Sequence, residues 1–328
     1  MNKNFKSILV TGGAGYIGSH VVEQLIKKKL KVVILDNLVT GYKRLINKKA
    51  KFIKGDIKNK KNIIKILIEN NVDTILHFAA YLNVSEAEKF KKKYFNNNII
   101  GTENLIKACK KTNVKNIIFS SSCSVYGNVK GAVSEKKKLN PMGYYAYTKY
   151  MGENIIKKYS KTLHYNFAIL RYFNVAGASP SYKIGQIEKT HGQLFKNLAI
   201  QALKIKPKVN IFGNDYKTKD GTCVRDYIHV SDLADIHIKS LDYLKKNKKS
   251  LILNCGYGKG YSVKDIVKIF KKIKKNCLII YQNRRPGDIA QVYANTKKFK
   301  KILKWKPKYN NINSILKSSI NWEKKLNS

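Results

Sequence analysis

Residues 7–10 form a short apolar run, and the eight residues that follow it carry glycines at three-residue intervals. These glycines are Gly12, Gly15 and Gly18. From Ile17 onward, apolar side chains recur at helical spacing, at Val21 and Leu25. The order predicts a strand, a glycine turn and a helix. Because glycines lack side chains, backbone N–H groups and the helix N-terminus can approach a pyrophosphate, so this segment is a candidate dinucleotide-binding loop.

Apolar runs and helical patterns alternate through the first half of the chain. The expected strands are residues 31–35, 51–54, 74–78, 116–120 and 166–170, and helical stretches between them include residues 62–69 and 102–111. Alternation of this kind predicts an α/β fold with a doubly wound parallel Rossmann sheet.

Beyond about Asn174 the alternation becomes irregular. One amphipathic helix still stands out, with Ser262 as its expected N-cap. Its apolar face comprises Val263, Ile266, Val267, Phe270 and Ile273. We therefore expect a cofactor-binding domain over residues 1–174, joined by a returning segment at about residues 226–248. A smaller mixed α/β substrate domain is expected over residues 175–328.

An acidic residue, Asp36, follows the second expected strand at about the distance from the glycine loop where a dinucleotide-binding fold holds the adenosine ribose. A carboxylate there binds ribose hydroxyls and repels a 2′-phosphate. The pattern therefore predicts NAD rather than NADP as the cofactor. The alternative is that Asp36 only caps the adjoining loop.

A serine-rich strand end and a Tyr-x-x-x-Lys segment make up the candidate catalytic group. Ser122 precedes Tyr145 by 23 residues, and Lys149 follows Tyr145 at the i+4 position, on the same face of the expected helix. A free tyrosine has a pKa of about 10, so ionisation at neutral pH requires help from a neighbouring ammonium and a positive nicotinamide ring. With that help Tyr145 becomes a general base toward a sugar hydroxyl. Tyr144 and Tyr147 are close rivals for this role.

The formal net charge is +46, which raises the question of nucleic-acid binding. Only five of the 66 basic residues are arginines, however, and the lysines are spread along the chain. Readers of phosphates and base edges favour the arginine fork. We interpret the lysine excess as a compositional bias on solvated faces, with no specific nucleic-acid partner.

The remaining composition predicts a cytoplasmic protein without a membrane partner. No apolar run approaches the roughly 18 residues of a membrane helix, and residues 1–6 lead into a strand rather than a signal-peptide core. The five cysteines are widely spaced with no CxxC pair, so we expect them to be reduced, mostly buried and not metal ligands.

Together, these motifs resemble those of the UDP-galactose 4-epimerases, which belong to the extended short-chain dehydrogenase family. The resemblance spans nearly the whole chain, from TGGAGYIGSH at its start to Arg285-Pro286-Gly287-Asp288. Its most specific part comprises residues 211–215, 220–222 and 224–230. It implies interconversion of UDP-glucose and UDP-galactose: C4 is oxidised with NAD while Tyr145 takes the O4 proton and Ser122 hydrogen-bonds O4. The hydride then returns on the opposite face, and a homodimer is expected.

The resemblance also assigns binding residues. The NAD contacts it implies are Gly12, Gly15, Tyr16, Ile17, Gly18, Asp36, Asn37, Asp56, Ile57, Phe78, Ala79, Ala80, Asn98, Ser120, Tyr145, Lys149 and Tyr172. The UDP-sugar contacts it implies are Ser122, Ser124, Tyr145, Asn174, Gln193, Leu194, Asn210, Phe212, Arg225, Arg285, Asp288 and Val292. Two departures affect the details of binding. Leu82 replaces a phosphate-directed lysine, and Gln193-Leu194 stands where Asn-Leu is often found.

Two further questions concern the reaction and the substrate. A 4,6-dehydratase shares the oxidation but needs an acid beside the serine, and Ser122-Cys123-Ser124 supplies none. A non-catalytic NAD-binding or nucleic-acid-binding protein would not need Tyr145, Lys149 and Ser122 together.

Val292 stands where a bulky tyrosine restricts some family members to plain hexoses. Its smaller side chain predicts that UDP-N-acetylglucosamine also fits, unless Val292 only faces the core.

Overall fold

The computed structural model describes residues 6–187, 193–285 and 287–328. The chain divides into two compact units. Unit 1 comprises residues up to 125, 141–171 and 234–253, and unit 2 comprises residues 126–140, 172–233 and 254–328.

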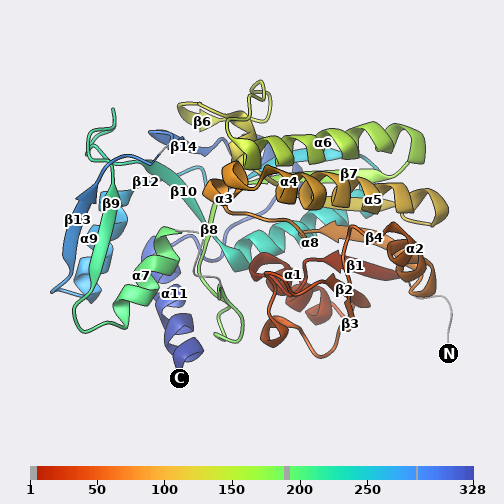
Figure 1. Cartoon of the computed structure of the whole chain (residues 1–328), viewed down its shortest axis with the longest axis horizontal. Coiled ribbons are helices and arrows are strands. Elements are labelled where there is room, and N and C mark those ends of the chain that lie inside the picture. The colour runs from red at the N-terminus through yellow and green to blue at the C-terminus, as the bar shows by residue number, and fades with distance from the viewer. Residues whose placement is uncertain (1–5, 188–192, 286) are drawn as a thin grey trace. The chain divides into compact units, whose positions relative to one another are not determined.

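A seven-stranded, mostly parallel sheet forms the centre of unit 1, in the order β11-β7-β5-β4-β1-β2-β3 (Figure 1). Its strands are β1 (Ser7–Thr11), β2 (Val32–Asp36), β3 (Lys51–Lys54), β4 (Val72–His77), β5 (Asn116–Ser122), β7 (Asn166–Tyr172) and β11 (Leu251–Cys255). The pairs β1–β2, β1–β4, β2–β3 and β4–β5 are parallel, so their carboxyl ends meet at one edge. The predicted doubly wound α/β fold is confirmed.

Helices cover both faces of this sheet (Figure 1). They are α1 (Tyr16–Lys27), α2 (Lys60–Glu69), α3 (Val84–Lys89), α4 (Lys91–Tyr94), α5 (Gly101–Ala108), α6 (Tyr144–Leu163) and the part of α8 (Val230–Asn247) from residue 234 onward. Alternate residues of a strand face opposite sides. Leu9 and Phe119 thus join the core under α2, α5 and α6, whereas Ile8 and Val10 face the side of α1 and α8. The ion pair between Lys28 and Asp242, at 3.0 Å, links the end of α1 to α8.

Unit 2 contains two smaller sheets and its own apolar core. The strands are β6 (Gly131–Val133), β8 (Asn174–Ala176), β9 (Lys208–Phe212), β10 (Val224–His229), β12 (Gly260–Ser262), β13 (Leu278–Gln282) and β14 (Gln291–Ala294). The helices are α7 (Leu194–Ala202), α9 (Val263–Ile273), α10 (Lys297–Leu303) and α11 (Ile312–Asn327). Phe195, Phe270 and Leu316 bring α7, α9 and α11 into one core.

The predicted α9 cap is confirmed, since Ser262 and Asp265 form a reciprocal capping box. On the predicted apolar face, Ile266, Val267 and Phe270 are buried, but Ile273 is 39% exposed because it lies in the last turn. That part of the prediction was wrong.

The units differ from the expected division in two places. Residues 126–140 belong to unit 2, because β6 within them pairs with β14, over 150 residues further along the chain. The returning segment is residues 234–253 rather than about 226–248, since β10 pairs with β8, β12 and β14 in unit 2. None of the described helices combines the length and the apolar character needed to cross a bilayer.

Candidate active site

The glycine turn lies at the carboxyl end of β1 and leads into α1. Gly12 has φ +73°, and a Cβ built on it would lie 2.6 Å from the backbone nitrogen of Ala79. A Cβ on Gly18 would lie 2.3 Å from the Gly12 carbonyl oxygen. Gly15 is the N-cap of α1 and offers no side-chain cap, so the predicted residues Tyr16 and Ile17 form an open first turn. This tight turn ending on a helix N-terminus fits a pyrophosphate.

Asp36 ends β2 and turns its carboxylate toward the glycine turn. One oxygen accepts the Ala14 N–H at 3.0 Å and the other accepts the Leu38 N–H at 2.9 Å. Burial raises the pKa of this carboxyl, and these two backbone bonds oppose the rise. Asp36 therefore does cap the loop, but each oxygen keeps a lone pair for a ribose hydroxyl.

Gly41 was not predicted as part of the site, yet the structure makes it necessary. A Cβ at this position would lie 2.7 Å from an Asp36 carboxylate oxygen. Any side chain there would take up the space beside the carboxylate predicted to bind a ribose. Its only signal in the sequence is a glycine five residues after that acid.

Neighbouring strand ends bring most of the other predicted cofactor residues to this edge. The Asn37 amide donates to Asp56 at 3.1 Å, which joins the ends of β2 and β3, and Ile57 is buried behind them. Phe78 hydrogen-bonds the backbone of β1 through its N–H. Ala79 and Ala80 follow Phe78 in the loop after β4, beside the glycine turn. The carboxyl edge of a parallel sheet is where such folds bind nucleotides.

Asn98 is an exception among the predicted cofactor contacts. Its oxygen accepts from the Tyr81 N–H and the Asn97 amide, and its nitrogen donates to the Tyr81 carbonyl and the Thr148 hydroxyl. An asparagine side chain has two donors and two acceptor sites, so all are used. Asn98 therefore joins the loop after β4 to α6 in the protein alone, and its predicted contact with the cofactor stays a prediction.

The three predicted catalytic residues lie together in unit 1. The Lys149 ammonium donates to the Ser120 carbonyl at 2.8 Å, and the Ser122 hydroxyl lies close enough to the Tyr145 phenol to favour its ionised form. Ser124 donates to the Ser122 Oγ through its N–H at 3.2 Å and its hydroxyl at 3.0 Å. With these two bonds accepted, the Ser122 hydroxyl proton is available for the phenol oxygen.

Burial dominates the electrostatics of this group. It raises the pKa of Tyr145, with the Ser122 hydrogen bond acting against the rise. It also lowers the pKa of Lys149 to about 7. The lowering of the Tyr145 pKa that was predicted from Lys149 is thus not present in the protein alone, because the ammonium is desolvated and bound to Ser120.

The rival tyrosines are placed less favourably. Tyr147 is 40% exposed, and its ring packs against Tyr144 with centroids 5.7 Å apart. Tyr144 also lies under the Lys91 ammonium, on the side of α4. Among the three, Tyr145 is the one whose phenol is bonded to Ser122.

The predicted UDP-sugar residues lie in unit 2, apart from Ser122, Ser124 and Tyr145 in unit 1. The Arg225 guanidinium approaches Asp288 at 3.3 Å, and that of Arg285 lies 3.8 Å above the centre of the Phe212 ring. Arg225 and Val292 are paired in the parallel register of β10 and β14 and so share a face. Two guanidinium groups suit a diphosphate. Pro286, between the loop residues Arg285 and Asp288, lies outside the described residues.

Other predicted members occupy separate elements of unit 2. Asn174 begins β8 and Asn210 lies on β9, and both are exposed. Tyr172, which was predicted as an NAD contact, is a buried residue at the end of β7. Gln193 and Leu194 begin α7. The Gln193 side-chain oxygen is buried with no hydrogen-bond partner among the described residues, so it suits a donor from a ligand.

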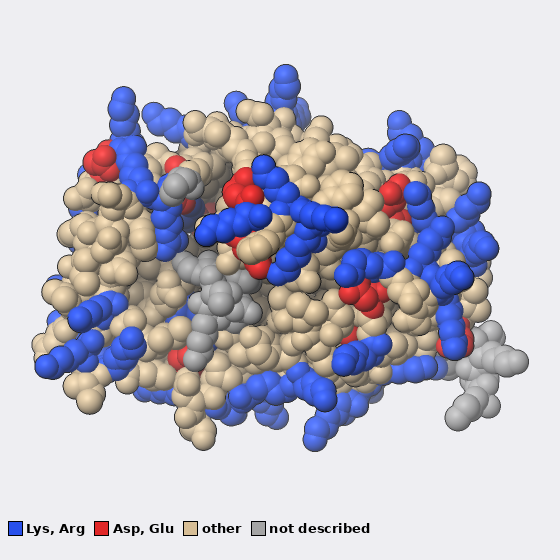
Figure 2. All heavy atoms as spheres, in the orientation of Figure 1, with Lys and Arg blue, Asp and Glu red and all other residues tan. Residues whose placement is uncertain are grey.

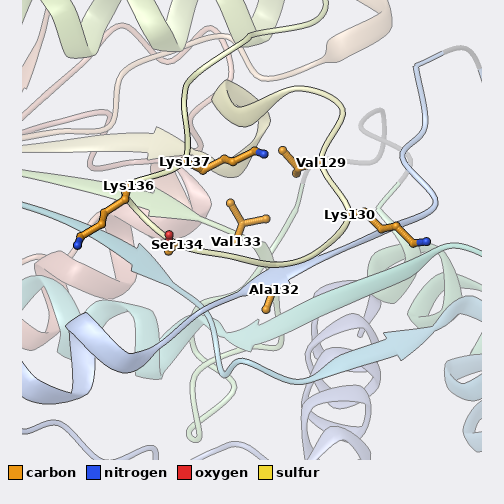
Figure 3. Close-up of a pocket in the computed structure, with 7 residues that line it drawn as sticks. All are labelled: Val129, Lys130, Ala132, Val133, Ser134, Lys136 and Lys137. Atoms are coloured by element: carbon orange, nitrogen blue, oxygen red, sulfur yellow. The ribbon is translucent and has the colours of Figure 1, made fainter.

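A pocket of about 320 Å³ lies along residues 129–137, which include β6; Gly131 of this strand pairs with the predicted site residue Val292 of β14 (Figure 3). Three lysines line it, but Lys130 and Lys136 point away from each other, so they do not converge on one anion (Figure 3). Lys and Arg side chains are scattered over the face drawn in Figure 2, with fewer acidic side chains among them. Among the described residues, no group of acidic, His and Cys side chains is placed to hold a metal ion. Four cysteines are buried and Cys123 is half-buried, and none of the five forms a disulfide.

Comparison with known proteins identifies the family to which this chain belongs. The model of the NAD dependent epimerase/dehydratase family matches residues 8–256. The chain belongs to this family. A UDP-glucose 4-epimerase of Lactobacillus helveticus is 40% identical over 97% of both chains.

Two solved structures of this family's fold add detail. The Bifidobacterium longum UDP-glucose 4-epimerase in complex with NAD⁺ and UDP is 35% identical, with TM-score 0.90 and 98% of both chains covered. The Campylobacter jejuni UDP-Glc/GlcNAc 4-epimerase is 38% identical, with TM-score 0.85, 98% of this chain and 99% of that chain covered. This epimerase/dehydratase chain therefore shares its complete fold with both.

Proposed function

We propose that this protein is an NAD-dependent UDP-glucose 4-epimerase, which interconverts UDP-glucose and UDP-galactose. The observation that carries the proposal is the placement of Ser122 beside the Tyr145 phenol, with Lys149 held one helical turn further along by the Ser120 carbonyl. The relatives named above as 4-epimerases support the substrate and the cofactor.

Bound NAD⁺ supplies a hydride acceptor for C4 of the hexose and a positive ring charge that favours the ionised phenol. The protein supplies the proton chemistry. Tyr145 removes the O4 proton as the C4 hydride leaves and gives a proton back when the hydride returns, and the Ser122 hydroxyl orients O4. Because burial lowers the pKa of Lys149 to about 7, small changes in local charge decide its protonation.

The residues beside Ser122 favour epimerisation of the sugar over dehydration. Elimination of water from the sugar needs an acid beside Ser122. The neighbours in sequence are Ser121 and Cys123, and the Ser121 hydroxyl is bonded to Glu153 at 2.6 Å. Neither is a carboxylic acid, so a 4,6-dehydratase is not supported.

The cofactor residues fit NAD in this structure. The glycine turn has no room for side chains, and Asp36 keeps lone pairs for the ribose hydroxyls. A 2′-phosphate would meet the Asp36 carboxylate, which disfavours NADP. Arg225, Arg285, Asp288 and Gln193 would bind the UDP part, because two guanidinium forks suit a diphosphate and Gln193 has an unused buried acceptor.

The substrate range extends to UDP-N-acetylglucosamine and UDP-N-acetylgalactosamine. Val292 lies beside Arg225 on one face of the β10–β14 pair and leaves more space than tyrosine. The similarity to the Campylobacter jejuni UDP-Glc/GlcNAc enzyme supports this substrate range.

The proposal also includes a cytoplasmic location and a homodimer. The cysteines form no disulfide, which supports a reducing compartment. The dimer rests on the family resemblance and is tested by sedimentation equilibrium.

The activity is tested directly with purified protein. Incubation with UDP-glucose should yield UDP-galactose without added cofactor, and denaturation should release NAD. Absence of UDP-galactose from protein that carries NAD would contradict the proposal.

A further inference from the structure

Three consecutive serines of β5 each face a different turn of α6. The Ser120 carbonyl accepts from Lys149, the Ser121 hydroxyl donates to Glu153, and the Ser122 hydroxyl lies beside the Tyr145 phenol. The α6 partners are spaced four residues apart, so they form one stripe along the helix. Glu153 continues the Tyr-x-x-x-Lys stripe by one more turn and was not among the predicted site residues.

Glu153 is fully buried, with 0% of its side chain exposed, and is paired with Arg171 of β7. The Arg171 Nε donates to the Oε1 atom at 2.8 Å, and a terminal nitrogen donates to Oε2 at 2.6 Å. Oε1 accepts the Ser121 hydroxyl as well, at 2.6 Å. One carboxylate therefore fixes α6 to both β5 and β7.

The position of α6 along β5 matters because the contact between Ser122 and the Tyr145 phenol tolerates little movement. A helix rises about 1.5 Å per residue, whereas O–H···O bonds span only about 2.5–3.0 Å. A slide of α6 by less than one residue would therefore break the contact that orients the phenol. Misplacement of a catalytic group by about 1 Å can slow a reaction about a hundredfold.

We propose that Glu153 is a positioning residue for the 4-epimerase reaction, acting through Ser121 and Arg171. It holds α6 on β5 so that the Tyr145 phenol stays opposite Ser122. The inference rests on the proposed function for its kinetic consequence, but its structural consequence concerns residues of unit 1 alone.

The most selective test is Ser121→Ala, which removes one hydroxyl and leaves the Glu153–Arg171 pair. We expect kcat for UDP-glucose to fall roughly tenfold with KM within about twofold, as a loss of orientation in the transition state requires. The rising limb of the pH profile should move to higher pH, because the Ser122 bond that favours the ionised phenol is loosened. The bound NAD content should not change.

Tyr159→Phe on the same helix is the matched control. It also removes one hydroxyl, which donates to Glu103 of α5 at 3.0 Å and touches none of the three serines. We expect wild-type kcat and pH profile. Glu153→Gln should lower kcat at least as far as Ser121→Ala, and adding Ser121→Ala to it should have no further effect, since both act through one link.

A second readout does not need the sugar reaction. In protein labelled at the tyrosine Cζ carbon, the Tyr145 NMR resonance is the one missing from Tyr145→Phe. Ser121→Ala should shift it and Tyr159→Phe should not. If the resonance shifts but the wild type forms no UDP-galactose, positioning stands and the proposed function fails. If the wild type is active and Ser121→Ala changes neither the rate, the pH profile nor the resonance, the positioning role is refuted.

Discussion

The two units hold their candidate residues in different ways. In unit 1 the candidate catalytic side chains are buried or half-buried, and two hydrogen bonds from consecutive residues of β5 hold α6 in place. In unit 2 the candidate diphosphate ligands lie on loops and strand ends. Arg225 contacts Asp288 at a long 3.3 Å, and Asp288 is about one-third exposed.

This difference indicates a division of labour. Buried groups with fixed partners suit a reaction whose transition state tolerates little displacement. Weak, partly exposed ion pairs contribute little to stability and can exchange partners when a diphosphate arrives. Changes in unit 1 should therefore act mainly on kcat, and changes in unit 2 on KM and substrate choice.

The largest effect should come from Tyr145→Phe. Loss of a general base typically lowers the rate by about 10²–10⁴-fold, and we expect kcat to fall in this range with NAD retained. Tyr147→Phe, which alters an exposed neighbour, should keep kcat within about twofold. Steady-state assays in both directions measure this. Near-wild-type turnover of Tyr145→Phe would assign the base to another residue.

In unit 2, Arg225→Met should raise KM for UDP-glucose by roughly 10–100-fold with little change in kcat, since a hydrogen bond to a charged group contributes about 1.5–3 kcal/mol. Arg284→Met is the control, because Arg284 is engaged with Asp215 and the Tyr216 ring. A fall in kcat at unchanged KM would show that the comparison between the units is wrong.

Lys149→Met should stabilise the cofactor-free protein at neutral pH. Burial lowers the pKa of Lys149 to about 7, so the unfolded chain binds more protons than the folded one between pH 7 and about 10. Protonation thus favours unfolding of the wild type. After the lost Ser120 bond is subtracted, we expect a gain of about 1–3 kcal/mol in the free energy of unfolding at pH 7.

This gain should shrink as the pH rises toward and beyond 10, because the unfolded lysine, with a pKa of about 10.4, then loses its proton as well. Urea unfolding at several pH values measures it. The control is Lys158→Met, an exposed lysine of the same helix, which should show no such trend. A difference between wild type and Lys149→Met that does not change with pH would argue against a buried, weakly protonated ammonium.

The smallest effect concerns substrate choice. Val292→Tyr should abolish turnover of UDP-N-acetylglucosamine while leaving UDP-glucose within about threefold, because overfilling a packed wall costs roughly 1–3 kcal/mol. Val292 is only 4% exposed, so the alternative is a purely structural role. Equal losses on both substrates, or no acetamido-sugar turnover by the wild type, would support that alternative.

The features predicted from the sequence are those that depend on short segments. The glycine turn, the strand that ends at Asp36 and the Tyr-x-x-x-Lys stripe need only local spacing, and the structure places all three as expected. The capping box at Ser262 is likewise local.

Features that depend on distant partners were missed. The pairing of β6 with β14 puts residues 126–140 in unit 2, and the sequence of neither segment indicates it. The bonds of Asn98 to Tyr81 and Thr148, which join the loop after β4 to α6, were likewise not predicted. Glu153 could have been noticed as a charged residue on a helix stripe that must be buried, but its partner Arg171 is 18 residues away on β7.

The central claim is that the hydrogen removed from C4 returns to C4 of the same sugar. UDP-glucose carrying deuterium at C4 tests this in ordinary water. The account predicts UDP-galactose that keeps its deuterium at C4. Deuterium lost to solvent, or found at C6 as a dehydratase would leave it, would contradict the account.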